Sequence, residues 1–155
     1  MLIKLGRIGV RALAVLMVAG CGFFPSDPIP PSVAIRIDDG IVSVVLPCSP
    51  SDIELAEVYI PTPNVSDPVW VARGYLNSPT RIVSFDPNLW ATVVGKYDVE
   101  SEFGVSIVST DYVNETEISN PSLAEHLPQG DYWVEGSVMS LDAFLALPSV
   151  TEACP

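Results

Sequence analysis

Short apolar segments rich in valine, separated by turns that contain proline, occupy most of this chain. Valine and other β-branched residues favour extended strands, and no segment keeps the apolar spacing of a helix for more than a turn or two. Proline beside Ser, Asn or Asp, as in "PTPNVSDP" and "DPN", is typical of turns. The pattern therefore predicts a domain built from strands. The expected strands cover residues 33–46 (as a hairpin), 53–61, 68–76, 81–85, 89–101, 103–109 and 131–140.

Seven or eight short strands with a turn about every ten residues indicate a β-sandwich or a small barrel. We expect an all-β, immunoglobulin-like β-sandwich with a short C-terminal helix, because the sandwich is the commoner of the two. Its central aromatic residue would be Trp70, Trp90 or Trp133, although the interval from Trp70 to Cys154 is too long for an antibody-type domain. Two helical segments are expected: one turn at 122–126, and a helix at 140–148 with Ser140 as its N-cap.

The N-terminus has the layout of a secretory signal peptide. Lys4, Arg7 and Arg11 give it a positive start, and an uncharged apolar block of nine residues follows at 12–20. A helix that crosses a bilayer needs about 20 apolar residues. The block is therefore too short to span a membrane, whereas a basic start and a short apolar block before small residues are typical of a signal peptide.

The end of this segment, "VAGC" at 18–21, resembles the lipobox of bacterial lipoproteins, in which an aliphatic residue and two small residues precede a cysteine. The resemblance covers residues 1–21 only. It implies that Cys21 receives a diacylglyceryl group, that a signal peptidase cuts after Gly20, and that the acylated protein is anchored to the cell membrane on its extracytoplasmic side. The alternative is an ordinary signal peptide in which Cys21 merely lies near the cut.

This reading divides the chain into a signal peptide at 1–20, a proline-rich tether at 21–32 and a single β-sandwich domain at 33–155. Without the signal peptide, four basic residues remain against 19 carboxylates, a net charge of 4 minus 19, or minus 15. Such a surface repels nucleic acid and anionic lipid headgroups. Binding to the lipid bilayer must then come from acyl chains on Cys21, and we expect no nucleic-acid partner.

Two further cysteines, Cys48 and Cys154, remain when Cys21 is assigned to the lipid. An even number of cysteines in an exported chain favours a disulfide, and this one would close a loop of about 105 residues. Neither residue lies in a C-x-x-C pair, so the sequence gives little support to a redox or zinc site. The alternative is two buried free thiols.

The best candidate for a site is the acidic run "YDVESEFG" at 97–104. If this run is extended, Asp98, Glu100 and Glu102 project from one face and could hold a calcium ion through oxygen ligands. The run lacks the glycine-containing loop of a typical calcium site. We favour a solvated face whose charge guards a sheet edge, and the sequence predicts neither a metal site nor a cofactor.

Signals for catalysis are weak. His126 is the one histidine, and the sequence contains no G-x-S-x-G, P-loop, dinucleotide-binding or H-E-x-x-H motif. We therefore expect a non-enzymatic interaction or accessory module that binds another protein of the cell envelope. The alternatives are a carrier lipoprotein for a small apolar ligand and a hydrolase whose carboxylates come from distant segments.

Overall fold

The computed structural model of this protein describes residues 32–62, 67–77 and 80–154. The predicted signal peptide, the lipobox with Cys21 and nearly all of the tether lie outside these ranges. Within them, no helix has both the length and the apolar character needed to cross a membrane.

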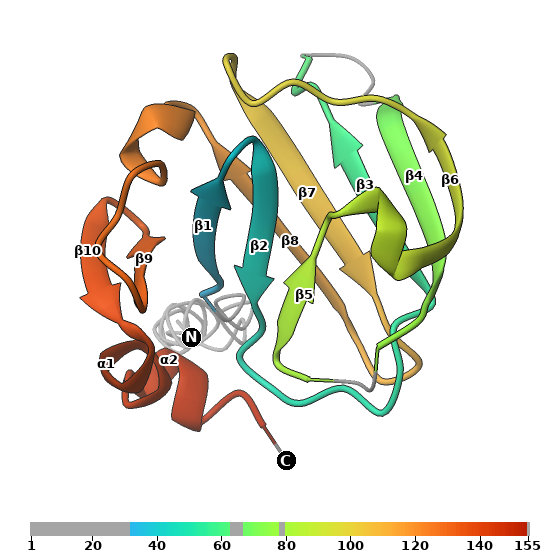
Figure 1. The fold of residues 1–155 in the computed structure, drawn as a ribbon. Coiled ribbons are helices and arrows are strands. Elements are labelled where there is room, and N and C mark those ends of the chain that lie inside the picture. Colours follow the sequence, from blue (N-terminus) through green and yellow to red (C-terminus); the bar gives the residue numbers. More distant parts are fainter. Residues whose placement is uncertain (1–31, 63–66, 78–79, 155) are drawn as a thin grey trace, which may run out of the picture.

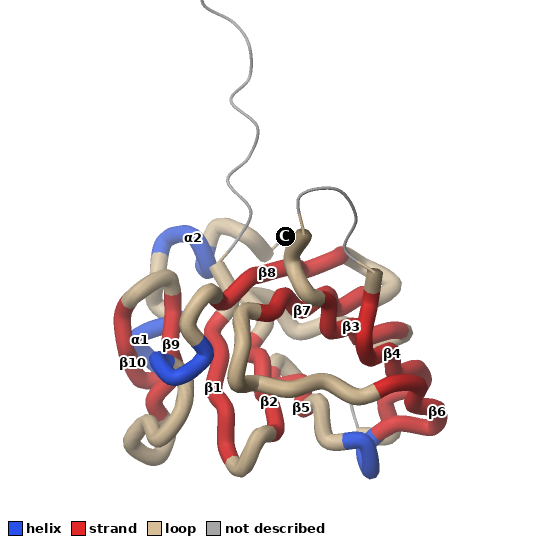
Figure 2. The backbone as a smooth tube through the Cα atoms, turned by 90° about the horizontal axis from the view of Figure 1, so that it is seen from above, coloured by secondary structure: helices blue, strands red, loops and turns tan. Residues whose placement is uncertain are grey.

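The described residues form two sheets of five strands each, which face each other as a sandwich (Figure 1). The first sheet contains, in spatial order, β10 (Ser137–Ser140), β9 (Asp131–Val134), β1 (Ala34–Asp38), β2 (Ile41–Val45) and β5 (Ile82–Ser84). The second contains β6 (Trp90–Gly95), β4 (Pro68–Tyr75), β3 (Leu55–Tyr59), β7 (Phe103–Val108) and β8 (Val113–Ile118). Every neighbouring pair is antiparallel. The predicted β-sandwich is therefore confirmed, and Figure 2 shows its two layers from above.

Two of the described strands were not predicted as separate strands. The segment 131–140, predicted as one strand, folds into the β9–β10 hairpin because Glu135 (φ 45°) and Gly136 (φ 92°) make a tight two-residue turn. The segment 113–118, for which no strand was predicted, is strand β8. Its sequence, "VNETEI", is polar because β8 lies at a sheet edge and alternate side chains face solvent.

The main core fills the space between the two sheets. From the first sheet, Ile35 and Val44 are paired neighbours and point inward, as do Ile37 and Val42. They meet a buried set from the second sheet that consists of Ala56, Val58, Trp70, Ala72, Phe103, Val105 and Ile107. Trp70 is the central aromatic residue of this core. Its ring stacks on Phe85, with centroids 5.2 Å apart, and meets Trp90 edge-on.

A second apolar cluster lies on the opposite face of the first sheet. The short helices α1 (Leu141–Leu145) and α2 (Pro148–Thr151) bring Phe144 and Val150 against Ala34 and Val45. One helix was predicted over 140–148, and the structure has two. Ser140 is the N-cap of α1, as predicted, and its hydroxyl accepts a hydrogen bond from the Ala143 amide at 3.3 Å.

The two ends of the sandwich carry different structural elements (Figure 1). The helix end carries α1, α2 and the C-terminal segment. The first described residue, Ser32, is also held there, because its hydroxyl donates to the Glu135 carboxylate at 2.7 Å and lies 3.4 Å from the Ser149 hydroxyl. The loop end consists of residues 38–41, 96–102 and 119–126, and it includes the 3₁₀ turn η2 (Pro121–Leu123). The chain thus enters the domain at the helix end, and β1 runs from there to the loop end.

Asn114 in β8 is buried, with 6% of its surface exposed, and its Nδ2 has no hydrogen-bond partner among the described residues. A buried donor without a partner costs about 1–3 kcal/mol. We therefore expect Asn114→Leu, which removes the donor and keeps the branched side-chain shape, to raise the free energy of unfolding by about 1 kcal/mol. Urea unfolding of the two proteins measures this difference. A lower stability for the leucine variant would show that the amide is satisfied.

Candidate functional site

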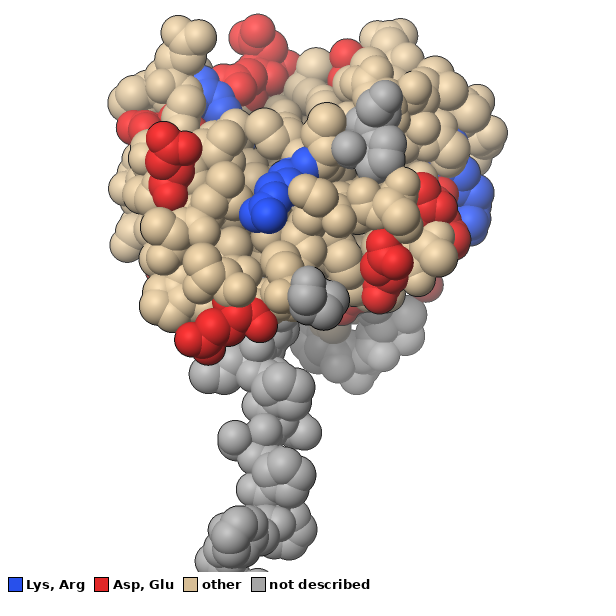
Figure 3. Space-filling model, turned by 90° about the horizontal axis from the view of Figure 1, so that it is seen from below, with Lys and Arg blue, Asp and Glu red and all other residues tan. Residues whose placement is uncertain are grey.

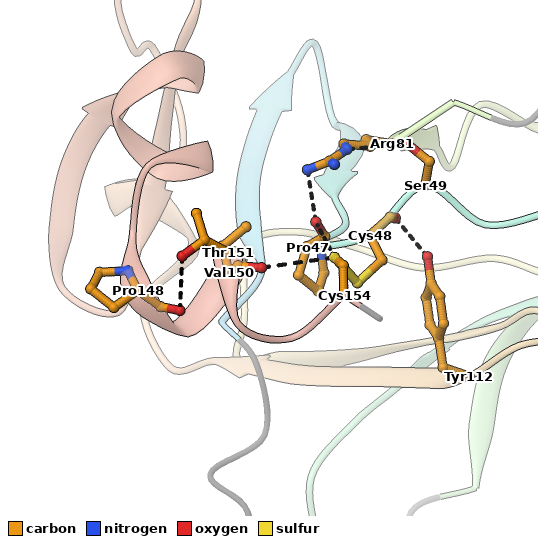
Figure 4. Close-up of a disulfide and its surroundings, with 9 residues drawn as sticks. All are labelled: Pro47, Cys48, Ser49, Arg81, Tyr112, Pro148, Val150, Thr151 and Cys154. Carbon is orange, nitrogen blue, oxygen red and sulfur yellow. Dashed lines mark hydrogen bonds between the residues drawn. A yellow bond between two sulfur atoms is a disulfide. The ribbon is translucent and has the colours of Figure 1, made fainter.

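The two cysteines predicted to pair lie together at the helix end (Figure 4). The sulfur atoms of Cys48 and Cys154 are 2.11 Å apart, and their Cα atoms are separated by 5.5 Å. The prediction that the fold brings these two residues to disulfide distance is confirmed. The link attaches the segment after α2 to the segment that follows β2.

Hydrogen bonds fix the segment around Cys48 independently of the disulfide. The hydroxyl of Tyr112 donates to the carbonyl oxygen of Cys48 at 2.6 Å. The guanidinium group of Arg81 donates to the carbonyl oxygen of Pro47 at 2.8 Å and to the hydroxyl of Ser49 at 3.1 Å. This part of the protein is a structural anchor, and it brings together no group suited to catalysis.

The acidic run at 97–104 does not have the extended geometry that the calcium hypothesis required. Strand β6 ends at Gly95, and residues 96–102 form an irregular segment at the loop end. Asp98, Glu100 and Glu102 are all exposed, and Asp98 accepts a hydrogen bond from the Glu100 amide at 2.9 Å. Across the part of the chain that the structure describes, no group of three or more His, Cys, Asp or Glu side chains is arranged to hold a metal ion.

Six carboxylates lie at the loop end. The three segments that form it carry Asp38, Asp39, Asp98, Glu100, Glu102 and Glu125, together with one lysine, Lys96, and His126. The helix end carries carboxylates as well, among them Glu135, Asp142 and Glu152, and Figure 3 shows several acidic groups in the view from below. Acidic side chains therefore occur at both ends of the domain, and the loop end additionally has two hollows.

One side of the β1–β2 turn borders an acidic hollow of about 210 Å³, which is lined by Ile37, Asp38, Asp39, Gly40, Glu125 and His126. A parallel bridge between Ile37 and Glu125 holds the two sides of this hollow together. In it, the Ile37 amide donates a hydrogen bond to the carbonyl oxygen of Ala124 at 2.9 Å. Arg36 holds the neighbouring segment in place. Its guanidinium group pairs with Asp38 and donates to the carbonyl oxygens of Leu127, Pro128 and Asp131.

The other side of the same turn borders an aromatic hollow of about 310 Å³, which is lined by Gly40, Ile41, Trp70, Pro87, Gly95, Lys96 and Tyr97. Trp70 is only 1% exposed and forms the floor. Pro87 is exposed and is fixed in the 3₁₀ turn η1 (Pro87–Leu89), where Asp86 caps the amide of Asn88. Lys96 also lines this hollow and is the one cationic residue in the lining.

Gly95 determines how the chain closes this hollow. Its φ is +86°, and a Cβ atom added there would lie 2.0 Å from the carbonyl oxygen of Val69, so the position requires glycine. The turn at Gly95 brings Tyr97 edge-on to Trp70, with ring centroids 5.5 Å apart. The Tyr97 hydroxyl donates to Phe85 O at 3.3 Å. Burial raises the pKa of Tyr97, and the hydroxyl therefore stays protonated for this bond at neutral pH.

Sequence reasoning did not find either hollow. Asp38 and Asp39 fall in the predicted hairpin and His126 in the predicted helical turn, and nothing in the sequence connects the two aspartates with Glu125. The aromatic hollow takes its lining from four separate parts of the chain. The pairing of β1 with β2 and the path from β6 to β7 bring these parts together, and neither can be read from local patterns.

Comparison with known proteins gave no match. No protein family, no curated protein and no solved structure resembles this chain closely enough to be reported as similar. The two hollows that share Gly40 at the loop end are therefore the candidate site on the evidence of the structure alone.

Proposed function

We propose that this protein is a lipid-anchored interaction module of the cell envelope, whose loop end binds another envelope protein. The observation that carries the proposal is the separation between the point where the chain enters the domain and the two hollows. Ser32, the last residue of the predicted tether, is held at the helix end. The length of β1 separates it from the two hollows.

A lipid on Cys21 would place the helix end toward the membrane and the loop end away from it. The chain that follows the predicted signal peptide has a net charge of minus 15 and is repelled by anionic headgroups, so acyl chains must hold it at the membrane. The same charge argues against nucleic acid as a partner.

The packing between the sheets supports an interaction module over a carrier. The facing residues of both sheets form one continuous buried cluster, and the aromatic hollow, which both sheets line, opens at the surface and ends at the buried Trp70. A hydrolase has no supporting observation in the described residues.

Membrane attachment is tested by Cys21→Ala. We expect the variant to lose incorporation of labelled palmitate and to move from the membrane fraction to the soluble fraction, because one uncharged residue replaces the acylation site. Centrifugal fractionation and acyl labelling measure both effects. Cys48→Ala is the control and should stay in the membrane fraction. Continued labelling of Cys21→Ala would contradict the lipid anchor.

Partner binding is tested by photo-crosslinking in intact cells. A photoreactive amino acid at position 100, on the exposed loop end, should crosslink to an envelope protein. The same amino acid at position 142, on the exposed face of α1, is the control. Absence of protein crosslinks from position 100, or equal yields from both positions, would contradict the proposal.

A further inference from the structure

We propose that the two hollows at the loop end together bind one segment of a partner protein that carries a cationic side chain next to a bulky apolar side chain. The cationic group would occupy the acidic hollow, and the apolar group would occupy the aromatic hollow. This inference rests on the proposed interaction function and adds the chemistry of the partner.

The first step is the position of the hollows. Both are lined by Gly40, so they lie on the two sides of one β1–β2 turn. Gly40 has a φ of +77° and no side chain to separate them. One short peptide segment lying across the turn can therefore place neighbouring side chains in both.

The second step is the difference in lining. Asp38, Asp39 and Glu125 surround the acidic hollow, and only Asp38 is paired with Arg36 in a salt bridge. The aromatic hollow has an apolar wall made by Ile41, Pro87 and Tyr97 above the buried Trp70. Lys96 lies at the aromatic hollow, so a cationic side chain is favoured on the other side of Gly40.

The third step is the charge of the whole surface. Six carboxylates and one lysine occur in the three segments of the loop end. Complementary potentials accelerate association and select partners of the opposite sign. An acidic partner would be repelled by the carboxylates of the loop end, and a purely apolar partner would leave them unpaired. A basic segment would pair with them.

The aromatic hollow is large enough to take a bulky apolar side chain. Its volume of about 310 Å³ is at the lower limit of ordinary ligand sites, and its floor and walls are fixed by the hydrogen bond of Tyr97 and by the η1 turn. A preformed pocket loses little conformational entropy on binding. A leucine, phenylalanine or methionine side chain of the partner fits this description.

The test uses the full-length lipoprotein in intact cells, with the photoreactive amino acid at position 100 as the reporter of partner binding. The acidic hollow is altered by Asp39→Asn together with Glu125→Gln, which keep the side-chain shapes and remove two charges. Asparagine also tolerates the φ of 50° at position 39. The matched control is Asp142→Asn with Glu152→Gln, which removes two charges from exposed residues of the helix end.

The aromatic hollow is altered by Pro87→Ser. The matched control is Pro148→Ser, because both prolines are exposed and stand at the start of a short helical turn. Thermal unfolding of every variant shows whether the domain remains folded, and only variants that unfold within a few degrees of the parent protein are compared for crosslinking.

We expect each hollow variant to reduce the crosslinking yield about fivefold, equivalent to roughly 1 kcal/mol of binding free energy, and each control to leave it unchanged. Mass analysis of the crosslinked peptide should find Lys or Arg beside a bulky apolar residue. Unchanged yields in both hollow variants, or a crosslinked segment without a basic residue, would overturn this inference and leave the interaction function standing. Absence of any crosslink from position 100 would instead remove the proposed function itself.

Discussion

Replacing Cys48 and Cys154 together by alanine is expected to lower the free energy of unfolding by about 4 kcal/mol. The two residues are separated by 106 positions in the sequence, and a crosslink that closes a loop of about 100 residues removes about 4.7 kcal/mol of conformational entropy from the unfolded chain. Urea unfolding of the oxidised parent protein and of the double variant measures the loss. Cys21→Ala is the control, because it removes a cysteine outside the described domain and should leave the urea midpoint unchanged.

The native structure should change little in this double variant. The hydrogen bonds of Tyr112 and Arg81 to the 47–49 segment do not depend on the sulfur atoms, and Phe144 and Val150 keep α1 and α2 on the first sheet. We therefore expect a near-native circular dichroism spectrum with a lower urea midpoint. A loss of less than about 1 kcal/mol would mean that the cysteines are not linked in the protein.

Trp70→Ala is expected to lower the free energy of unfolding by about 4 kcal/mol. Trp70 is 1% exposed and contacts the rings of Phe85, Trp90 and Tyr97, so alanine would leave a large cavity at the centre of the core. Denaturant unfolding measures the loss, and near-ultraviolet circular dichroism should show reduced ordering of the remaining aromatic rings.

Trp70→Phe is the matched variant for this test, because it keeps an aromatic ring and removes less volume. Its loss should be clearly smaller than that of Trp70→Ala. Equal losses in the two variants would indicate that the indole makes a specific contact instead of filling space. A loss below about 1 kcal/mol in Trp70→Ala would contradict the central position of Trp70 in the core.

The sandwich could be predicted because the strands carry local signals. The "DDG" turn gives the β1–β2 hairpin, and Asp39 and Gly40 both adopt positive φ in the structure, as such a two-residue turn requires. The β9–β10 turn has the same geometry, yet its first residue is Glu135. Glutamate rarely adopts a positive φ, so the local signal for this turn was too weak to predict it.

Other features depend on tertiary contacts that a single sequence does not contain. Val44 and Val45 interrupt the alternation of apolar and polar residues that is typical of a strand with one face in solvent. Both are buried, because the helices cover the outer face of the first sheet. Polar residues such as Asn114 and Glu115 leave β8 without a clear strand signal in the sequence. The strand forms because β7 pairs with it over its whole length. The hollows are of this kind as well, since distant segments supply their walls.

The central place of β1 in the first sheet has a mechanical consequence. Force applied at Ser32 against a load held at the loop end would act along the axis of β1. The hydrogen bonds of an antiparallel pair are perpendicular to the strands, so the whole β1–β2 ladder, from Ala34 to Asp38, would be sheared at once instead of opened bond by bond. A force between Ser32 and the loop end would therefore be opposed by all the hydrogen bonds of the β1–β2 ladder together.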